Sequence, residues 1–257
     1  MMSTQPMKQI DDDEEVDAAA DFTLAPRKLA VVAADKGATF GYAPFFSSIA
    51  ETAAAAGCDT VVYALAPQPG IPLVTHSQLF GRARRITTVS LEVTEPDGSA
   101  VVEVWRQGVR TPHRFRQRLA RSQDSDWNKR ALMRGLAART FGLTMFLACG
   151  EANIISIQRE SLATIDRFEF LPRLAGQRLI LNPSHTYMAR PEMKEKRRRL
   201  SEGGRVVISV WNPGHQAREA KLPWQVFVNG VEASDLIKPI AFAEPLIHIG
   251  VYGLASV

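Results

Sequence analysis

The chain has 257 residues, a formal net charge of +4 at pH 7, 46% hydrophobic residues and 23% charged residues. This length and balance are typical of a globular protein with a sizeable core, built as one large α/β domain or two small ones. Two cysteines exclude a disulfide framework, and no apolar run approaches the roughly 20 residues of a membrane-spanning helix. The N-terminus lacks the basic and apolar regions of a secretory signal, so we expect a cytoplasmic protein.

The first segment of the chain is strongly acidic. Residues 11–15 read DDDEE and lie in a polar stretch that alanines follow, a composition that favours disorder. We therefore expect a disordered acidic N-terminal tail over residues 1–26 and one folded domain over residues 27–257.

The domain is predicted to open with a βαβ unit. Lys28–Asp35 is a short, valine-rich run typical of a buried strand. Pro44–Gly57 contains helix formers and closes on a glycine, and Cys58–Leu65 is a second apolar run. A strand, a helix and a strand within about 30 residues form a parallel strand pair. The sequence therefore predicts an α/β fold.

A hairpin, a helix and a further strand are predicted next. Arg85–Val93 and Ala100–Gly108 are extended segments on either side of the turn signal EPDG. A basic extended segment, HRFRQRLA, comes after them, and Ser125–Thr140 opens with a Ser-Asp pair suited to capping a helix. The apolar run FGLTMFLAC then predicts a strand that ends at Cys149.

The second half continues with helices and strands. A helix ending at Gly176 leads into the predicted strand Gln177–Ser184. Pro191–Gly204 has proline at its start and glycines at its end, as helices often do. Arg205–Gly214 predicts a strand and a turn, and two more extended segments, the first ending in an Asn-Gly turn, close the chain.

The helix predicted at Pro191–Gly204 carries the basic run KEKRRR, residues 194–199. Charge runs are usually solvated, so we expect a solvent-facing surface or ion pairs with Glu192, Glu195 and Glu202. Nucleic acid or another anion is the alternative partner. We do not favour it, because no aromatic-rich platform accompanies the run.

Cys149 is the most informative residue, because it stands at a strand end before Gly150 and Glu151. Most buried cysteines pack as small hydrophobic residues, and we expect this of Cys58. Sites in open α/β sheets gather beyond the carboxyl ends of strands, so Cys149 is equally a candidate nucleophile. Gly150 would free backbone N–H groups for an oxyanion, and Glu151 would be the base that a thiol needs.

Other chemistries lack a sequence motif. Cys149 has no CxxC partner, and the five histidines show neither HxH nor HxxxH spacing, so we expect no metal. The sequence has no GxGxxG motif, no P-loop and no G-x-S-x-G motif. Nucleotide binding and a Ser-His-Asp hydrolase therefore have no support, and we expect no cofactor.

The order of elements resembles the nitrilase, or carbon–nitrogen hydrolase, superfamily over about residues 28–254. LTMFLACGE resembles the strand that leads into the nucleophilic cysteine of that superfamily. RLAGQRLILNPSHT resembles its next helix, strand and Asn-Pro loop. RRRLSEGGRVVISVWN resembles the segment in which a helix bearing Arg and Glu leads into a strand ending in Asn.

The resemblance implies a four-layer αββα sandwich that associates as a homodimer and hydrolyses a small amide or nitrile. Cys149 would attack the substrate carbon, ammonia or an amine would leave, and water would hydrolyse the thioester. Asn182, His185 and Tyr187, near the end of the NPS strand, would face the substrate. The resemblance also ties the Arg- and Glu-bearing helix to the active-site layer, so we expect Glu202 to pair with an arginine or cap backbone N–H groups.

Two positions depart from the superfamily. Its general base, a Glu, follows the second strand, where this sequence has Leu65 or Ala66. Its Lys lies in a basic extended segment, where Gln117 stands here between Arg116 and Arg118. One hypothesis is a hydrolase in which Glu151 is a relocated base, an arginine supplies the cation and Gln117 contacts the substrate. The alternative is a catalytically inactive scaffold of this fold that binds a small ligand or a protein partner.

Overall fold

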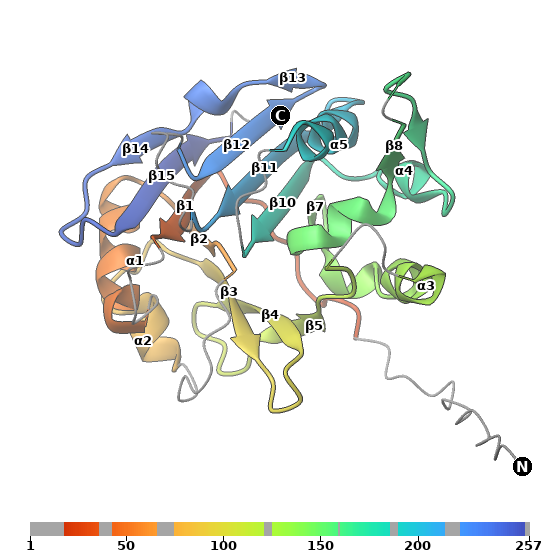
Figure 1. Ribbon diagram of the computed structural model, residues 1–257. Helices are drawn as coiled ribbons and strands as arrows, with labels where there is room; N and C mark the ends of the chain where they lie inside the picture. Colours follow the sequence, from red (N-terminus) through yellow and green to blue (C-terminus); the bar gives the residue numbers. More distant parts are fainter. Residues whose placement is uncertain are drawn as a thin grey trace, which may run out of the picture.

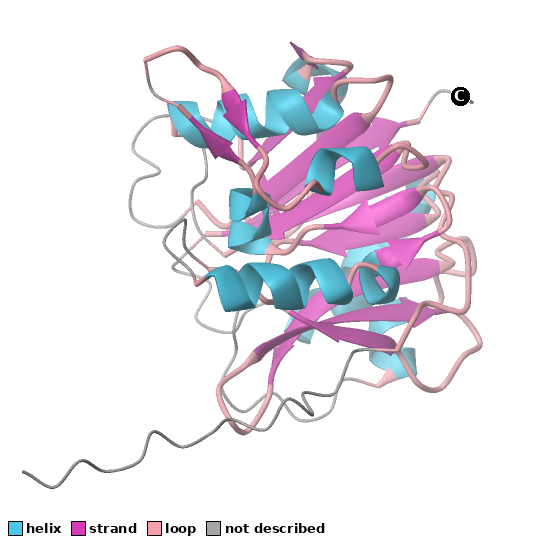
Figure 2. Cartoon of the chain, turned by 90° about the vertical axis from the view of Figure 1, so that its right-hand side faces the viewer, coloured by secondary structure: helices cyan, strands magenta, loops and turns pink. Residues whose placement is uncertain are grey.

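The computed structural model describes residues 18–35, 43–65, 75–120, 125–158, 160–185, 190–213 and 222–254. In this part of the chain two β-sheets face each other, and helices cover the outer face of each sheet (Figure 1). Figure 2 shows one helical layer in front of the strands. The expected four-layer αββα sandwich is therefore confirmed.

The first sheet contains the elements predicted for the first half of the domain. Its strand order is β14-β15-β1-β2-β3-β4-β5. β1, β2 and β3 are parallel, whereas β3, β4 and β5 are antiparallel, so the βαβ unit and the hairpin are confirmed. The bounds are β1 (Lys28–Ala34), β2 (Thr60–Tyr63), β3 (Thr88–Thr94), β4 (Ala100–Arg106), β5 (His113–Arg116), β14 (Lys238–Ile240) and β15 (Ile247–Gly253).

The second sheet contains the strand that leads to the cysteine. Its order is β13-β12-β11-β10-β7-β6, and β7, β10 and β11 are parallel. A separate two-stranded sheet pairs β8 with β9. The bounds are β6 (Thr140–Phe141), β7 (Thr144–Phe146), β8 (Ser156–Ile157), β9 (Thr164–Ile165), β10 (Leu179–Ser184), β11 (Val206–Trp211), β12 (Trp224–Val228) and β13 (Val231–Glu232).

The helices form the two outer layers. α1 (Phe46–Ala55) and α2 (His76–Phe80) pack against the first sheet, and α3 (Asp126–Arg134), α4 (Phe170–Arg173) and α5 (Pro191–Ser201) pack against the second. Short 3-10 turns are η1 (Ala43–Phe45), η2 (Ala137–Arg139), η3 (Cys149–Ile154) and η5 (Ser234–Leu236). None of the helices within the described residues is long and apolar enough to cross a membrane.

Burial on both faces explains why the central strands are apolar runs. In β1, Leu29 and Val31 face the second sheet, whereas Ala30 and Val32 pack in the layer of α1 and α2. Successive side chains of a strand point to opposite faces. A parallel strand between two covered faces therefore needs apolar residues at nearly every position.

The folded part of the chain begins before the expected boundary at residue 27. Leu24 is buried, its N–H donates to the Phe141 carbonyl at 3.1 Å and its carbonyl accepts from Thr144 Oγ1 at 2.7 Å. The Phe22 ring lies 4.9 Å from the Phe141 ring. These hydrogen bonds and this ring contact tie Phe22 and Leu24 to the domain.

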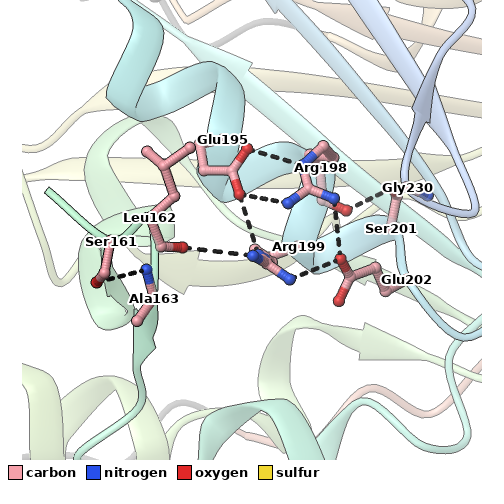
Figure 3. Close-up of polar contacts among 9 residues, drawn as sticks. All are labelled: Ser161, Leu162, Ala163, Glu195, Arg198, Arg199, Ser201, Glu202 and Gly230. Atoms are coloured by element: carbon pink, nitrogen blue, oxygen red, sulfur yellow. Dashed lines mark hydrogen bonds and ion pairs between the residues drawn. The ribbon is translucent and has the colours of Figure 1, made fainter. Parts of the chain in front are cut away.

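Two arginines of the basic run lie at the surface and are paired. Figure 3 shows Arg198 and Arg199 between Glu195 and Glu202, with N–O distances from 2.5 to 3.3 Å. The predicted pairing of Glu202 with an arginine is confirmed. Glu202 is 42% exposed, and exposed pairs of this kind contribute only about 0–1 kcal/mol.

Lys196 and Arg197 of the same run are buried and not solvent-facing, and Lys196 forms the ion pair with Glu192 that was the other expectation. Lys196 Nζ lies 2.7 Å from Asn153 Oδ1 and 2.9 Å from a Glu192 oxygen. Arg197 Nη1 donates to Gln225 Oε1 at 2.6 Å. These two cations can be buried because polar partners lie at the outer face of the second sheet, and a buried charge needs such partners.

The carboxyl ends of parallel strands from both sheets meet through one side chain. Asn212 follows β11 of the second sheet; its Oδ1 accepts from the Ala34 N–H at 3.0 Å. Its Nδ2 donates to the Leu65 carbonyl at 2.7 Å. Ala34 ends β1 and Leu65 lies just beyond β2 of the first sheet. Ligands of α/β sheets bind beyond such strand ends, so this edge is where a site is expected.

Replacing Asn212 with alanine should loosen this edge. The change leaves a main-chain N–H and a carbonyl without their bridging partner, and an unsatisfied buried polar group costs about 1–3 kcal/mol. We expect the free energy of unfolding in urea to fall by that amount. Asn212→Asp can still accept from Ala34 but cannot donate to Leu65, so it should also be destabilising. A change within error for both variants would contradict the bridging role.

Candidate active site

Cys149 stands just beyond β7, on backbone that is strained. The Leu147 N–H still pairs with the Leu181 carbonyl at 2.9 Å, and the chain then turns into η3. Cys149 has a φ of 43° and is 8% exposed. A non-glycine residue in this left-handed region costs about 1–3 kcal/mol and persists only where its surroundings enforce it. The surroundings of Cys149 must therefore hold it in place.

His185 lies between the Cys149 side chain and a buried carboxylate. It directly follows β10, its Nε2 is 2.7 Å from Glu92 Oε1, and Cys149 is the second side chain that interacts with its imidazole. Glu92 belongs to β3 and is 4% exposed, and its cross-strand neighbour Val102 faces the second sheet. Cys149, His185 and Glu92 thus form a chain of contacts that joins the two sheets.

The contacts of His185 favour its protonated form. Burial lowers the pKa of the imidazole, but the interactions with Cys149 and with the Glu92 carboxylate outweigh burial. Together they raise the pKa from 6.5 to about 10, as opposite charges at this range do. The imidazole therefore holds a proton at neutral pH.

Glu151, the base suggested by the sequence, is fully buried among N–H donors. Its carboxylate accepts from Arg139 Nη1 at 2.5 Å, from the Arg118 N–H at 2.8 Å and from the Ala148 N–H at 2.9 Å. Arg139 also donates to the Arg116 carbonyl at 3.0 Å. These contacts tie the cysteine turn to the segment after β5, so they favour a framework role over the role of base.

A glycine is required at position 150 because the backbone of the segment after β5 comes very close to it. A Cβ at this position would lie 2.4 Å from the Ala120 carbonyl oxygen. Only glycine permits such an approach of two backbones. Residues 117–120 therefore pack directly on the cysteine turn, and the part of Gly150 in an oxyanion hole stays a prediction.

Asn182 lies inside the protein beside the cysteine turn and is 1% exposed. Its Nδ2 donates to the Leu147 carbonyl at 2.5 Å and to the Cys149 carbonyl at 3.2 Å. Its Oδ1 accepts from Ser209 Oγ at 3.0 Å. The sequence suggested contact with the substrate, whereas these contacts are made to the protein itself.

The other predicted substrate residues are Gln117 and Tyr187. Gln117 Nε2 donates to the Leu119 carbonyl at 2.8 Å, and its Oε1 is buried without a hydrogen-bond partner in the described part of the chain. Tyr187 lies outside the described residues. Of the two residues expected where the superfamily has its Glu, Leu65 is buried beyond β2 and Ala66 is not described.

Glu92 was not predicted as a site residue, although the alternation of side chains along β3 indicates its position. Val89 and Leu91 of β3 pack in the layer of α1 and α2, so the alternation of a strand turns Glu92 toward the other sheet. A carboxylate on a buried strand face needs a partner, which marks such a residue for attention. The proposed cation Arg116, in contrast, pairs with Asp97 at 3.3 Å and is 46% exposed.

Comparison with known proteins finds solved structures that are similar to this chain at low sequence identity. No model of a protein family matches the sequence, and no curated protein matches it. The chain is similar in structure to amidases of the nitrilase superfamily. A mutant of the Nesterenkonia AN1 amidase from that superfamily is 13% identical, with a TM-score of 0.48 over 91% of this chain and 94% of that one.

Two further amidase structures are of the same kind. The NitN amidase is 12% identical, with a TM-score of 0.47 over 89% of this chain and 93% of that one. A second mutant of the amidase from Nesterenkonia sp. AN1 has the acetamide moiety of fluoroacetamide added covalently at its active site cysteine. It is 13% identical, with a TM-score of 0.48 over 92% of this chain and 93% of that one.

His185 should titrate near pH 10. Because its pKa is raised on folding, its contribution to stability is complete below about pH 6.5 and is lost as the pH rises through about 10. Glu92→Gln removes one of the charges that raise the pKa, so the midpoint should fall. NMR of the His185 ring protons across a pH series, assigned with a His185→Gln variant, measures it. Equal midpoints in the wild type and Glu92→Gln would contradict the pairing.

Glu151→Gln distinguishes a framework carboxylate from a base. The variant keeps the shape of the side chain but leaves Arg139 buried without an opposite charge, which costs about 3–5 kcal/mol. We expect the free energy of unfolding in urea to fall by about that much, and Arg139→Met combined with Glu151→Gln to recover part of it. A base predicts the reverse pattern, in which turnover is lost and stability is kept.

Proposed function

We propose that the protein is a cysteine-dependent hydrolase of carbon–nitrogen bonds, with a small amide or nitrile as its substrate. Cys149 is the nucleophile, His185 is the general acid and base, and Glu92 orients the imidazole. The observation that carries the proposal is the placement of His185 between the Cys149 side chain and the buried Glu92 carboxylate. A nucleophile, a base within hydrogen-bond reach and a third group that orients the base are the parts that such catalysis needs.

For an amide, the reaction starts from the thiolate and the imidazolium. The sulfur attacks the carbonyl carbon, a C–S bond forms and the π electron pair moves to oxygen. The tetrahedral intermediate collapses, the C–N bond breaks and the imidazolium gives its proton to the departing nitrogen. Water then attacks the thioester while the neutral imidazole takes its proton, and the acid leaves as the thiolate returns.

The environment of His185 suits the step that is hardest for an amide. An amine leaves only when its nitrogen receives a proton as the C–N bond breaks, and a positioned acid contributes about 10²–10⁴-fold to such a step. An imidazole with a pKa of about 10 retains that proton at neutral pH. The buried Glu92 carboxylate contacts Nε2 of the imidazole and keeps the ring oriented throughout the reaction.

An inactive scaffold that binds a small ligand or a protein is the second candidate. The observation that favours it is the presence of Leu65 and Gln117 where the resembled superfamily has its Glu and Lys. In the first proposal Glu92 of β3 supplies the carboxylate, and His185, which follows β10, supplies the cation. Turnover that depends on Cys149 decides between the two candidates.

Labelling with iodoacetamide should reach one of the two cysteines. Cys58 is buried and its pKa is raised to about 11 by desolvation, so it should stay unlabelled in the folded protein. Cys149 should react at neutral pH, as thiolates do. Mass spectrometry of peptides from native and unfolded protein gives both labelling yields, with Cys58 as the internal control. Equal resistance of the two cysteines in native protein would overturn the proposal.

Turnover of a panel of small amides and nitriles supplies the second measurement. Cys149→Ala should abolish it, and His185→Ala should lower it by about 10²–10⁴-fold. Cys58→Ala is the matched control, because it removes the other thiol far from the chain of contacts and should leave the rate unchanged. Turnover that survives in Cys149→Ala would contradict a cysteine nucleophile.

A further inference from the structure

We infer that Asn182 is a positioning residue that holds Cys149 in its left-handed conformation and so directs the thiol toward His185. The inference rests on the proposed function and adds to it a residue that acts through the main chain of the nucleophile. It follows from contacts on the helix-covered side of the second sheet, opposite the side on which Glu92 and His185 meet.

The contacts of Asn182 bracket the point where the chain leaves its strand. Nδ2 donates to the carbonyls of Leu147 and Cys149, which lie on either side of Ala148. Both carbonyls must point toward the same amide group for these bonds to form together. The two bonds together hold the peptide planes before and after the Ala148–Cys149 stretch, and this stretch contains the positive φ of Cys149.

The amide group is itself locked in one orientation. Ser209 is fully buried and lies directly beside Asn182 in the register of β10 and β11. Its hydroxyl donates to Asn182 Oδ1 at 3.0 Å, which leaves Nδ2 directed at the two carbonyls. Because an amide nitrogen donates and both carbonyls only accept, the assignment of oxygen and nitrogen follows from the network.

Positioning by Asn182 explains how strained backbone persists at the nucleophile. A positive φ at a residue with a Cβ is unfavourable and lasts only where neighbouring structure imposes it. Asn182 supplies hydrogen bonds from a rigid central strand, and its own geometry is set by the next strand. Without the donor, Cys149 can relax to negative φ, which carries its side chain away from His185.

The test is the reactivity of Cys149 in folded protein. Asn182→Ala and Asn182→Asp both remove the donor, and the second keeps the shape of the side chain. Val207→Ala is the matched control, because Val207 is fully buried on the same outer face of the sheet and belongs to a different core cluster from Cys149. Alkylation rates with iodoacetamide, measured over a pH series and corrected for the folded fraction, give the result for each variant.

We expect both Asn182 variants to react at least about tenfold more slowly at pH 7, with a pH dependence of the rate that differs from that of the wild type. Val207→Ala should keep the wild-type rate and profile. Ser209→Ala is a milder change and should reduce the alkylation rate of Cys149 by about threefold. This variant replaces an Asn182 variant that does not fold.

The failures of the two proposals can be told apart. Wild-type rates and profiles in the folded Asn182 and Ser209 variants would overturn the positioning role and leave the proposed function intact. A wild-type protein whose Cys149 resists alkylation would overturn the proposed function and, with it, this inference.

Discussion

The buried ion pair of Arg139 and Glu151 is the interaction on which the cysteine turn depends. Taking two charges out of water costs several kcal/mol for each ion. Both side chains here are fully buried. The cost is offset because the carboxylate accepts two backbone N–H groups and the guanidinium donates to two backbone carbonyls. An apolar pair could fill the same space, but it could not fix the direction of four peptide groups. The ion pair thus sets the path of the chain around Cys149.

The two-sheet architecture lets a carboxylate reach the thiol from a different strand. The superfamily that the sequence resembles has its Glu after the second strand, where Leu65 lies here. β2 and β3 are parallel, with Val62 beside Ser90, and two residues further along the same register Glu92 is level with Ala64. Glu92 is therefore one strand away from the expected place, at nearly the same height in the sheet. A neighbouring strand can supply the same charge because a histidine bridges the remaining space to Cys149.

The fold could be predicted from the sequence because hydrophobic patterning determines it. Apolar runs such as Lys28–Asp35 and Gln177–Ser184 indicated parallel strands, and the EPDG turn indicated the hairpin. The strand that leads to Cys149 was predicted for the same reason, although it ends at Phe146 and Cys149 begins η3 instead. His185 was expected at the site from the resemblance, as a residue facing the substrate, but its contact with Glu92 could not be found from the hydrophobic pattern. Glu92 and His185 are 93 residues apart, and no local pattern reports a contact over such a separation.

Helix α5 illustrates how position can outweigh residue type. Met193, Lys196, Arg197 and Leu200 are all buried, and their spacing is that of one helix face. Two cations therefore occupy the middle of a face that would ordinarily be apolar. Their polar partners allow this, and Lys196 reaches Asn153 near the end of η3. The turn is thus anchored near its start by Asn182, in its middle by Arg139 and near its end by Lys196. A backbone held at three points can retain a strained residue that a single contact would not hold, which is why Cys149 keeps its positive φ.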